Sequence, residues 1–97
     1  MYAATFKTEN GYIDRVYTIE GATLEKIISR FQAIQDLDSL VRMGRIMGDP
    51  TDGPALDRLE KFLEKFYAGK ITLEDLRNFT VSLSGGSITC IEVVKKE

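Results

Sequence analysis

The amino-acid sequence predicts an α+β fold: an antiparallel four-stranded sheet with helices packed on one face, in the order ββ–ααα–ββ. Two observations come from the ends of the chain, where Asn10-Gly11 and Gly85-Gly86 each separate two strand-like segments. The third observation is that apolar residues recur at helical spacing between these hairpins. Because an isolated hairpin is only marginally stable in water, we expect the two hairpins to join into one sheet. The 97 residues are enough for one core and too few for two, so we expect residues 1–97 to form a single domain.

The N-terminal hairpin is predicted from residues 2–9 and 12–19, which flank Asn10-Gly11. Asn-Gly is a preferred pair for a two-residue type I′ turn, and such a turn places Glu9 opposite Tyr12. Phe6 then lies opposite Arg15, and Lys7 lies directly across from Asp14.

This pairing gives the hairpin one apolar face and one polar face, as expected for a sheet that is covered on one side. Arg15 is the exception on the apolar face. Two interpretations of Arg15 remain open, a side chain that extends past the core to reach water and a contact with a ligand or partner.

The first helix is expected to begin after Thr23, whose side chain suits the N-cap position. Polarity rises at residues 36–39. Either the helix continues through this segment, or Asp38 or Ser39 caps a second short helix over residues 40–47. We favour the break. The apolar stripe of the first helix consists of Leu24, Ile27, Ile28, Phe31 and Ile34.

The clearest helical signal covers residues 54–69. Pro54 suits the first helical position, and Gly69 suits the left-handed residue that follows a helix. We therefore expect this helix to be the central element of the core. Its apolar stripe consists of Leu56, Leu59, Phe62, Leu63, Phe66 and Tyr67.

The segment before this helix is the only long irregular stretch in the interior of the chain. Asp49-Pro50 and Asp52-Gly53-Pro54 are turn formers, so residues 48–53 are predicted to form a surface loop. Loops of this kind carry function more often than cores do.

After the central helix, Thr72 and Asp75 resemble a capping box and predict one short helix. The C-terminal hairpin follows, with strands over residues 79–84 and 88–94. A two-residue Gly-Gly turn would place Ile88, Cys90 and Glu92 on the core face. We favour a three-residue loop, which directs Glu92 outward and places Ile88 and Cys90 on the outer face.

Composition narrows the classes of function. A formal net charge of −2 argues against bulk electrostatic binding of nucleic acid, which needs a concentrated basic face. A single cysteine, Cys90, excludes an internal disulfide and fits a reducing compartment. The chain starts without the features of a signal peptide and has no apolar run of membrane-spanning length. We therefore expect a cytoplasmic protein without membrane partners.

Catalytic chemistry has few candidate residues. The sequence contains no histidine, which removes the commonest general base and most transition-metal sites. Cys90 has no nearby cation in its strand to activate it. Asp49 and Asp52 are explained by turn formation, and they lack the ligand density of a calcium loop. We therefore expect no enzymatic activity, no cofactor and no bound metal.

The remaining hypothesis is contact with another protein or with a second copy of the chain. Methionine and arginine are enriched in interface cores, and both cluster just before the central helix. The alternative for these methionines and Ile46 is that they close the core. The predicted partner-binding residues are Arg42, Met43, Arg45, Ile46, Met47, Asp49 and Asp52.

A second contact is predicted on the first hairpin through Tyr12, Arg15 and Val16, with Ile88 and Cys90 nearby on the outer face. Unpaired sheet edges also invite strand addition or a homodimer. Compact chains without catalytic residues often act as regulators or inhibitors, including those of phages and mobile elements. Two other functions stay open: a nucleic-acid-associated module that uses a small arginine patch, and a domain that binds a small ligand in a pocket.

Overall fold

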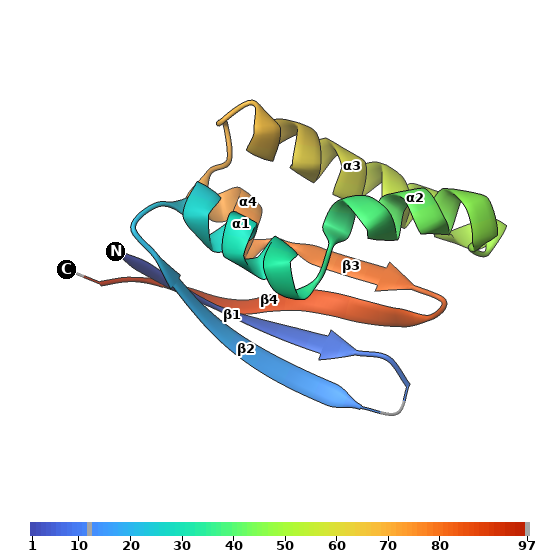
Figure 1. The fold of residues 1–97 in the computed structure, drawn as a ribbon, viewed down its shortest axis with the longest axis horizontal. Coiled ribbons are helices and arrows are strands. Elements are labelled where there is room, and N and C mark those ends of the chain that lie inside the picture. The colour runs from blue at the N-terminus through green and yellow to red at the C-terminus, as the bar shows by residue number, and fades with distance from the viewer. Residues whose placement is uncertain (12, 97) are drawn as a thin grey trace.

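The computed structural model describes residues 1–11 and 13–96 and contains one antiparallel sheet with helices on one of its faces (Figure 1). Its strand order is β2-β1-β4-β3, so the first and last strands of the chain form the central pair. This arrangement confirms the predicted α+β class and the ββ–ααα–ββ order. The strands are β1 (Tyr2–Glu9), β2 (Asp14–Gly21), β3 (Thr80–Leu83) and β4 (Gly86–Lys95). The helices are α1 (Leu24–Ile34), α2 (Leu37–Met47), the 3-10 turn η1 (Pro50–Asp52), α3 (Gly53–Tyr67) and α4 (Leu73–Arg77).

The predicted register of the N-terminal hairpin is wrong by two residues. Glu9 pairs with Asp14, so the connection has four residues and not two. The Asn10 side-chain oxygen accepts a hydrogen bond from the Ile13 N–H at 3.0 Å, which closes this longer connection. Such Asx turns compete with the two-residue turn that Asn-Gly also favours. Tyr12 lies outside the described residues.

A shift of two residues keeps each side chain on its expected face, because side chains alternate with period two. Phe6 therefore pairs with Tyr17 and not with Arg15. Lys7 lies opposite Val16, and its ammonium pairs with Glu9 at 2.9 Å along the same strand. The predicted Lys7–Asp14 cross-strand alignment is wrong.

The C-terminal hairpin turns at Ser84-Gly85, with Leu83 paired to Gly86. The three-residue loop that we favoured is therefore wrong. Val81 lies opposite Ile88, and both side chains are buried under the helices. Gly86 has φ of +154°, and a Cβ there would meet the Glu9 carbonyl oxygen of β1, so this position requires glycine.

A β-bulge in β4 explains why the last strand departs from the predicted pattern. Thr5 pairs with Glu92 while the adjacent Phe6 pairs with Cys90, which leaves Ile91 as the extra residue. Cys90 and Val93 are therefore both buried, and Glu92 is exposed. In a strand with unbroken alternation, burial of Cys90 and burial of Val93 would be mutually exclusive.

Most helix boundaries follow the predicted capping signals. The Thr23 side chain caps α1 by accepting from the Lys26 N–H, and Thr72 and Asp75 form a complete capping box at α4. The predicted break before the second helix is also confirmed. However, α2 begins at Leu37, and Asp36 caps it by accepting from the Ser39 N–H at 3.1 Å.

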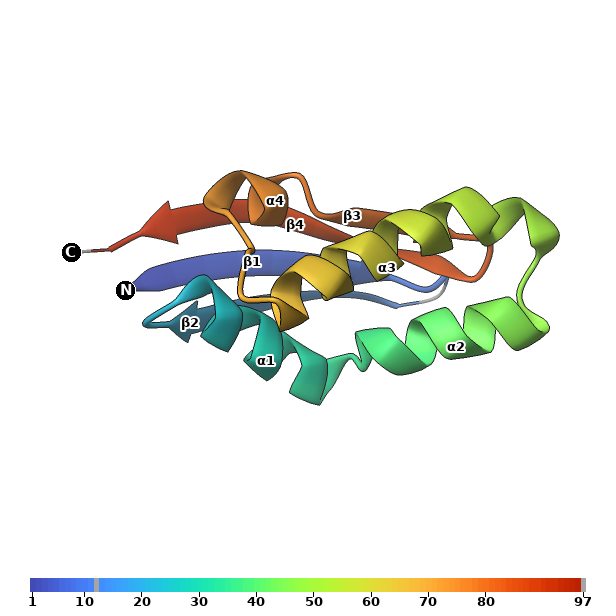
Figure 2. The same cartoon turned by 90° about the horizontal axis from the view of Figure 1, so that it is seen from above.

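The core lies between the sheet and the helices. The Phe6 ring of β1 stacks on the Phe31 ring of α1, with centroids 4.1 Å apart. Leu59 and Leu63 of α3 are buried in the same cluster, which agrees with the predicted central role of this helix. Helix α2 packs on α3 and lies beside it above the sheet (Figure 2). As a result, α2 contributes less to the core than α1 or α3.

Candidate functional site

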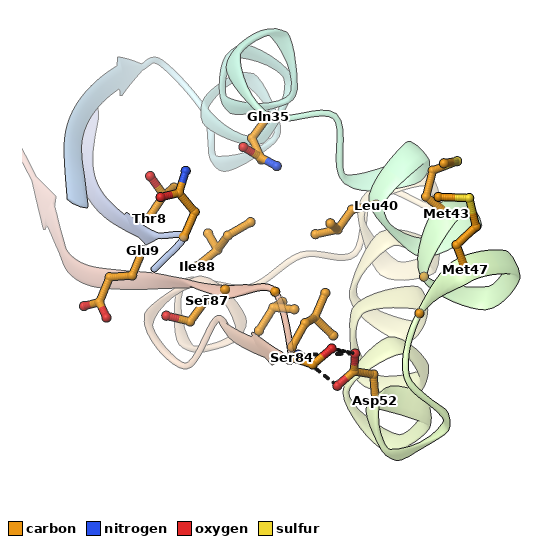
Figure 3. A pocket seen from close by; sticks show the side chains of 17 residues that line it. Thr8, Glu9, Gln35, Leu40, Met43, Met47, Asp52, Ser84, Ser87 and Ile88 are labelled. Atoms are coloured by element: carbon orange, nitrogen blue, oxygen red, sulfur yellow. Dashed lines mark hydrogen bonds between the residues drawn. The ribbon is translucent and has the colours of Figure 1, made fainter. Parts of the chain in front are cut away.

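A cleft of about 440 Å³ opens between α2, the end of β1 and the β3–β4 hairpin (Figure 3). Leu40 of α2 and Ile88 of β4 point into this space, and Gln35 points into it from the end of α1. We call this space the α2 cleft. Its apolar lining consists of Leu40, Met43, Met47, Val81, Leu83 and Ile88. Its polar lining includes Thr8, Glu9, Gln35, Ser84 and Ser87.

Close packing of α2 on α3 determines which residues face the cleft. A Cβ added at Gly44 would lie 2.8 Å from a methyl carbon of Leu56, so the two helices approach closely at this point. Val41 and Leu37 are the buried residues of α2. Met43 and Met47 then fall on the side of α2 that borders the cleft.

The predicted apolar contact residues of α2 are exposed. Relative exposure is 47% for Met43, 72% for Ile46 and 72% for Met47. The alternative that these three side chains close the core is therefore wrong. Large apolar side chains grouped on a surface are typical of interaction sites.

The two arginines of α2 lie on its other side, along a groove between α2 and α3. The Arg45 guanidinium donates to Asp57 at 2.6 Å and to Glu60 at 3.0 Å. These hydrogen bonds raise the pKa of Arg45 above its ordinary value. Arg42 donates to the Ser39 hydroxyl at 3.0 Å. Since acids of α3 pair with Arg45, the structure does not bring these arginines together as a free basic patch.

Asp49 and Asp52 have structural partners in the connection between α2 and α3. The exposed Asp49 carboxylate accepts from the N–H and the hydroxyl of Thr51, and these bonds lower the pKa of Asp49. Asp52 is only 9% exposed and accepts from the N–H of Ser84 at 3.1 Å and from its hydroxyl at 2.8 Å. Asp52 thus ties this connection to the β3–β4 turn at one end of the cleft, as the dashed lines in Figure 3 show.

The sequence predicts the α2 side of the cleft but not the sheet side. The residues of the sheet side are predicted only as parts of a hairpin, because no local pattern shows that this hairpin faces α2. They are Ser84, Ser87, Val81 and Leu83. The turn-forming character of Asp52 gave no indication of its partner, since Ser84 follows it by 32 positions.

The second predicted contact does not form one surface. Arg15 and Val16 are both exposed, but as neighbours in β2 they lie on opposite faces of the sheet. Tyr12 belongs to the part of the chain that the structure does not describe. Ile88 and Cys90, expected on the outer face, are each 5% exposed beneath the helices, so that expectation is wrong.

Reactive groups are scarce near the cleft. Burial raises the pKa of the Cys90 thiol to about 11, so this residue is a thiol at neutral pH. Within residues 1–11 and 13–96, no three cysteine, aspartate or glutamate side chains cluster as metal ligands would. No helix in that part of the chain has the length and apolar character needed to cross a membrane.

Searches of protein-family models, curated proteins and solved structures found no match to this chain.

Proposed function

We propose that this protein is a small non-enzymatic regulator or inhibitor that binds another protein through the α2 cleft and the exposed side chains at the end of α2. The observation that carries the proposal is that the exposed Met43 and Met47 line an apolar cleft. The exposed Ile46 lies beside them on α2, at the groove that Arg42 and Arg45 line. Met43 and Ile46 are neighbours on the helix surface, as residues three positions apart are. Methionine is unbranched and flexible, so it adapts to the shape of a partner.

The shape of the site favours a protein segment that presents apolar side chains. The cleft supplies a concave apolar lining, and the exposed end of α2 extends this surface beyond it. A buried apolar centre with a polar rim is the usual anatomy of an interface. Thr8, Gln35 and Ser87 provide that rim here. The lack of histidine in the sequence and the buried state of Cys90 support a role without catalysis.

The test compares the full chain with a variant in which Met43, Ile46 and Met47 are replaced by serine. We expect affinity capture from the native source, followed by calorimetry with the captured protein, to show that this variant loses partner binding. Its thermal stability should stay close to that of the wild type, because substitutions of exposed side chains change stability little.

Val94→Ser is the matched control, because Val94 is 41% exposed and lies on β4, outside the cleft. This control should retain the partner. Retention of the partner by the triple variant would refute the assignment of α2 as the binding surface. If the triple variant fails to fold, Met47→Lys alone supplies the same test at the most exposed methionine of the cleft.

A second candidate function is the binding of a small apolar ligand in the α2 cleft. The cleft volume of about 440 Å³ lies within the range of about 300–1,000 Å³ that small-molecule sites occupy. An apolar fluorescent probe such as anilinonaphthalene sulfonate would bind the native protein, and Leu40→Lys would abolish that binding. In contrast, the nucleic-acid alternative has little support, because Arg45 is paired with Asp57 and Glu60.

A further inference from the structure

β2 offers a long free edge that no other segment pairs with among the described residues. It is the outermost strand, and all eight of its residues pair with β1 on the other side. In Figure 1, β2 forms the lower border of the molecule, and no segment runs along its outer side. The opposite edge strand, β3, has only four residues, and its end is held by the Asp52–Ser84 hydrogen bonds.

The hydrogen-bonding pattern identifies which backbone groups of β2 point outward. The Met1 carbonyl accepts from the Lys96 N–H at the end of β4, so odd-numbered residues of β1 bond toward β4 and even-numbered ones toward β2. Those even-numbered residues pair with odd-numbered residues of β2, such as Tyr17. The N–H and C=O groups at positions 14, 16, 18 and 20 of β2 therefore face outward. The Arg30 guanidinium already donates to the outward carbonyl of Glu20.

This edge lacks most of the features by which proteins prevent strand addition. Its pairing with β1 is continuous and contains no bulge, and it has no proline. The centre of the strand, residues 16–19, is uncharged and rich in residues that favour strands. Val16 is 61% exposed and Ile13, just before the strand, is 51% exposed.

We infer that β2 pairs antiparallel with β2 of a second copy of this chain, about a two-fold axis at Val16, to form a continuous eight-stranded sheet. The N–H and C=O groups along a free sheet edge can form hydrogen bonds with a further extended strand. A two-fold axis perpendicular to the sheet keeps every side chain on its own face, so the axis must pass beside a single residue of β2. The charged side chains of β2 then determine which of its residues the axis can pass beside.

An axis at Tyr17 places Asp14 directly opposite Glu20 of the other copy, and two like charges in that position repel. An axis at Thr18 needs the Glu20 carbonyl as an acceptor, but Arg30 already uses it. An axis at Arg15 would place two guanidinium groups opposite each other. These three arrangements are therefore disfavoured.

An axis at Val16 satisfies the outward groups of residues 14, 16 and 18 without a charge conflict. Val16 faces Val16 of the second copy, and Asp14 faces Thr18, with each pair joined by backbone hydrogen bonds between outward groups. Arg15 faces Tyr17 in a pair without backbone hydrogen bonds, in which side chains approach more closely. A cationic side chain over an aromatic ring is attractive. Within the described residues, Arg15 makes no ion pair inside its own chain, so this contact would give it a partner.

Sedimentation of the full chain over a concentration series tests the inference. We expect the wild type to form dimers and Val16→Lys to be monomeric, because the substitution places two ammonium groups directly opposite each other. Val94→Lys is the control, since Val94 lies on the open face of the central strand β4 and is 41% exposed. This control should dimerise as the wild type does.

Cross-linking tests the position of the axis. Oxidation of Val16→Cys should give a covalent dimer that a reductant separates, because paired Cα atoms of adjacent strands lie about 5.5 Å apart, within disulfide range. Thr18→Cys should give no covalent dimer under the same conditions, since its partner is Asp14. Cys90 is buried and should not react in either protein.

Three results would overturn the inference. They are a wild type that is monomeric at every concentration, a Val16→Lys variant that still dimerises, and a Thr18→Cys variant that cross-links in preference to Val16→Cys. A dimer that is lost on Met47→Ser and kept on Val16→Lys would instead place the contact on α2. The test of partner binding at the α2 cleft measures capture of a different protein, so a failure of the dimer leaves that test unaffected.

Discussion

Asp52 shows how a single side chain can fix the border of the candidate site. Its carboxylate is almost buried, and it accepts hydrogen bonds from the N–H and the hydroxyl of Ser84. The pair joins the turn before α3 to the β3–β4 turn, two segments that line the same cleft. Because a buried acceptor needs its donors, we assign Asp52 a structural role at the cleft and not a direct contact with a partner.

We predict that Asp52→Ala lowers the free energy of unfolding by about 1–3 kcal/mol, because the Ser84 N–H loses its acceptor. Ser84→Ala removes only the hydroxyl donor and should cost about 1 kcal/mol. The measurement is urea unfolding of both single variants and the double variant. Since the two residues contact each other, the double variant should lose less than the sum of the singles. Additive losses would contradict a direct interaction.

Among secondary-structure elements, β4 departs most from its sequence pattern. The bulge at Ile91 lets the strand bury Ile88 and Cys90 on one side of the irregularity and Val93 on the other. A regular strand could place only one of these two sets of side chains on the face that the helices cover. The side chain of Ile91, at this irregularity, is 56% exposed.

We predict that deletion of Ile91 preserves the fold. Cys90 and Glu92 would then be consecutive, and the existing pairs Phe6–Cys90 and Thr5–Glu92 would become a regular ladder. Circular dichroism and cooperative urea unfolding are the measurements. Deletion of Thr5 in β1 is the control and should destabilise strongly, because it forces either Ala4 or Phe6 out of the core. Equal damage from the two deletions would refute this account of the bulge.

Helix α2 is the element whose position matters most for function. Asp36 caps its start, and Gly44 allows its close approach to Leu56. This packing leaves Met43 and Met47 at the border of the cleft. The sequence indicated an amphipathic helix here. What its more exposed side faces depends on where α3 and the sheet lie.

At the scale of the whole molecule, hydrogen-bonded carboxylates link stability to pH. Hydrogen bonds from the Ser39 N–H and hydroxyl lower the pKa of Asp36, and the Thr72 N–H is the main cause of the lowered pKa of Asp75. Their folded-state pKa values lie below the unfolded value of about 3.9. Their contribution to the free energy of unfolding is therefore complete at pH values above the unfolded-state pKa. It is lost as the pH falls through the folded-state pKa values.

We predict that the urea midpoint stays nearly constant from pH 7 to pH 5 and falls below about pH 4. The Asp36→Asn/Asp75→Asn double variant should show a weaker fall, since asparagine retains a capping oxygen but does not titrate in this range. If the urea midpoint fell equally with pH in the wild type and in the double variant, these two carboxylates would not be the groups that link stability to pH.

Much of this fold follows from local sequence. The capping signals at Thr23 and Thr72, the stripe of residues 54–69 and the break before α2 act through neighbours in the chain, so the sequence alone determined them. The alternation of residues 2–9 determined which face of the first hairpin is buried. For the candidate site, the clustering of methionine and arginine before the central helix indicated Met43, Ile46 and Met47 as contact residues.

Only the tertiary structure decided the features that depend on distant partners. The four-residue connection after Glu9, the bulge at Ile91 and the Asp52–Ser84 contact each rest on pairing that no local pattern encodes. A one-residue irregularity moves every later side chain of a strand to the other face, so Ile88 and Cys90 were misplaced. The α2 cleft exists because α2 packs on α3 while the β3–β4 hairpin lies opposite it, and that arrangement is a property of the assembled core.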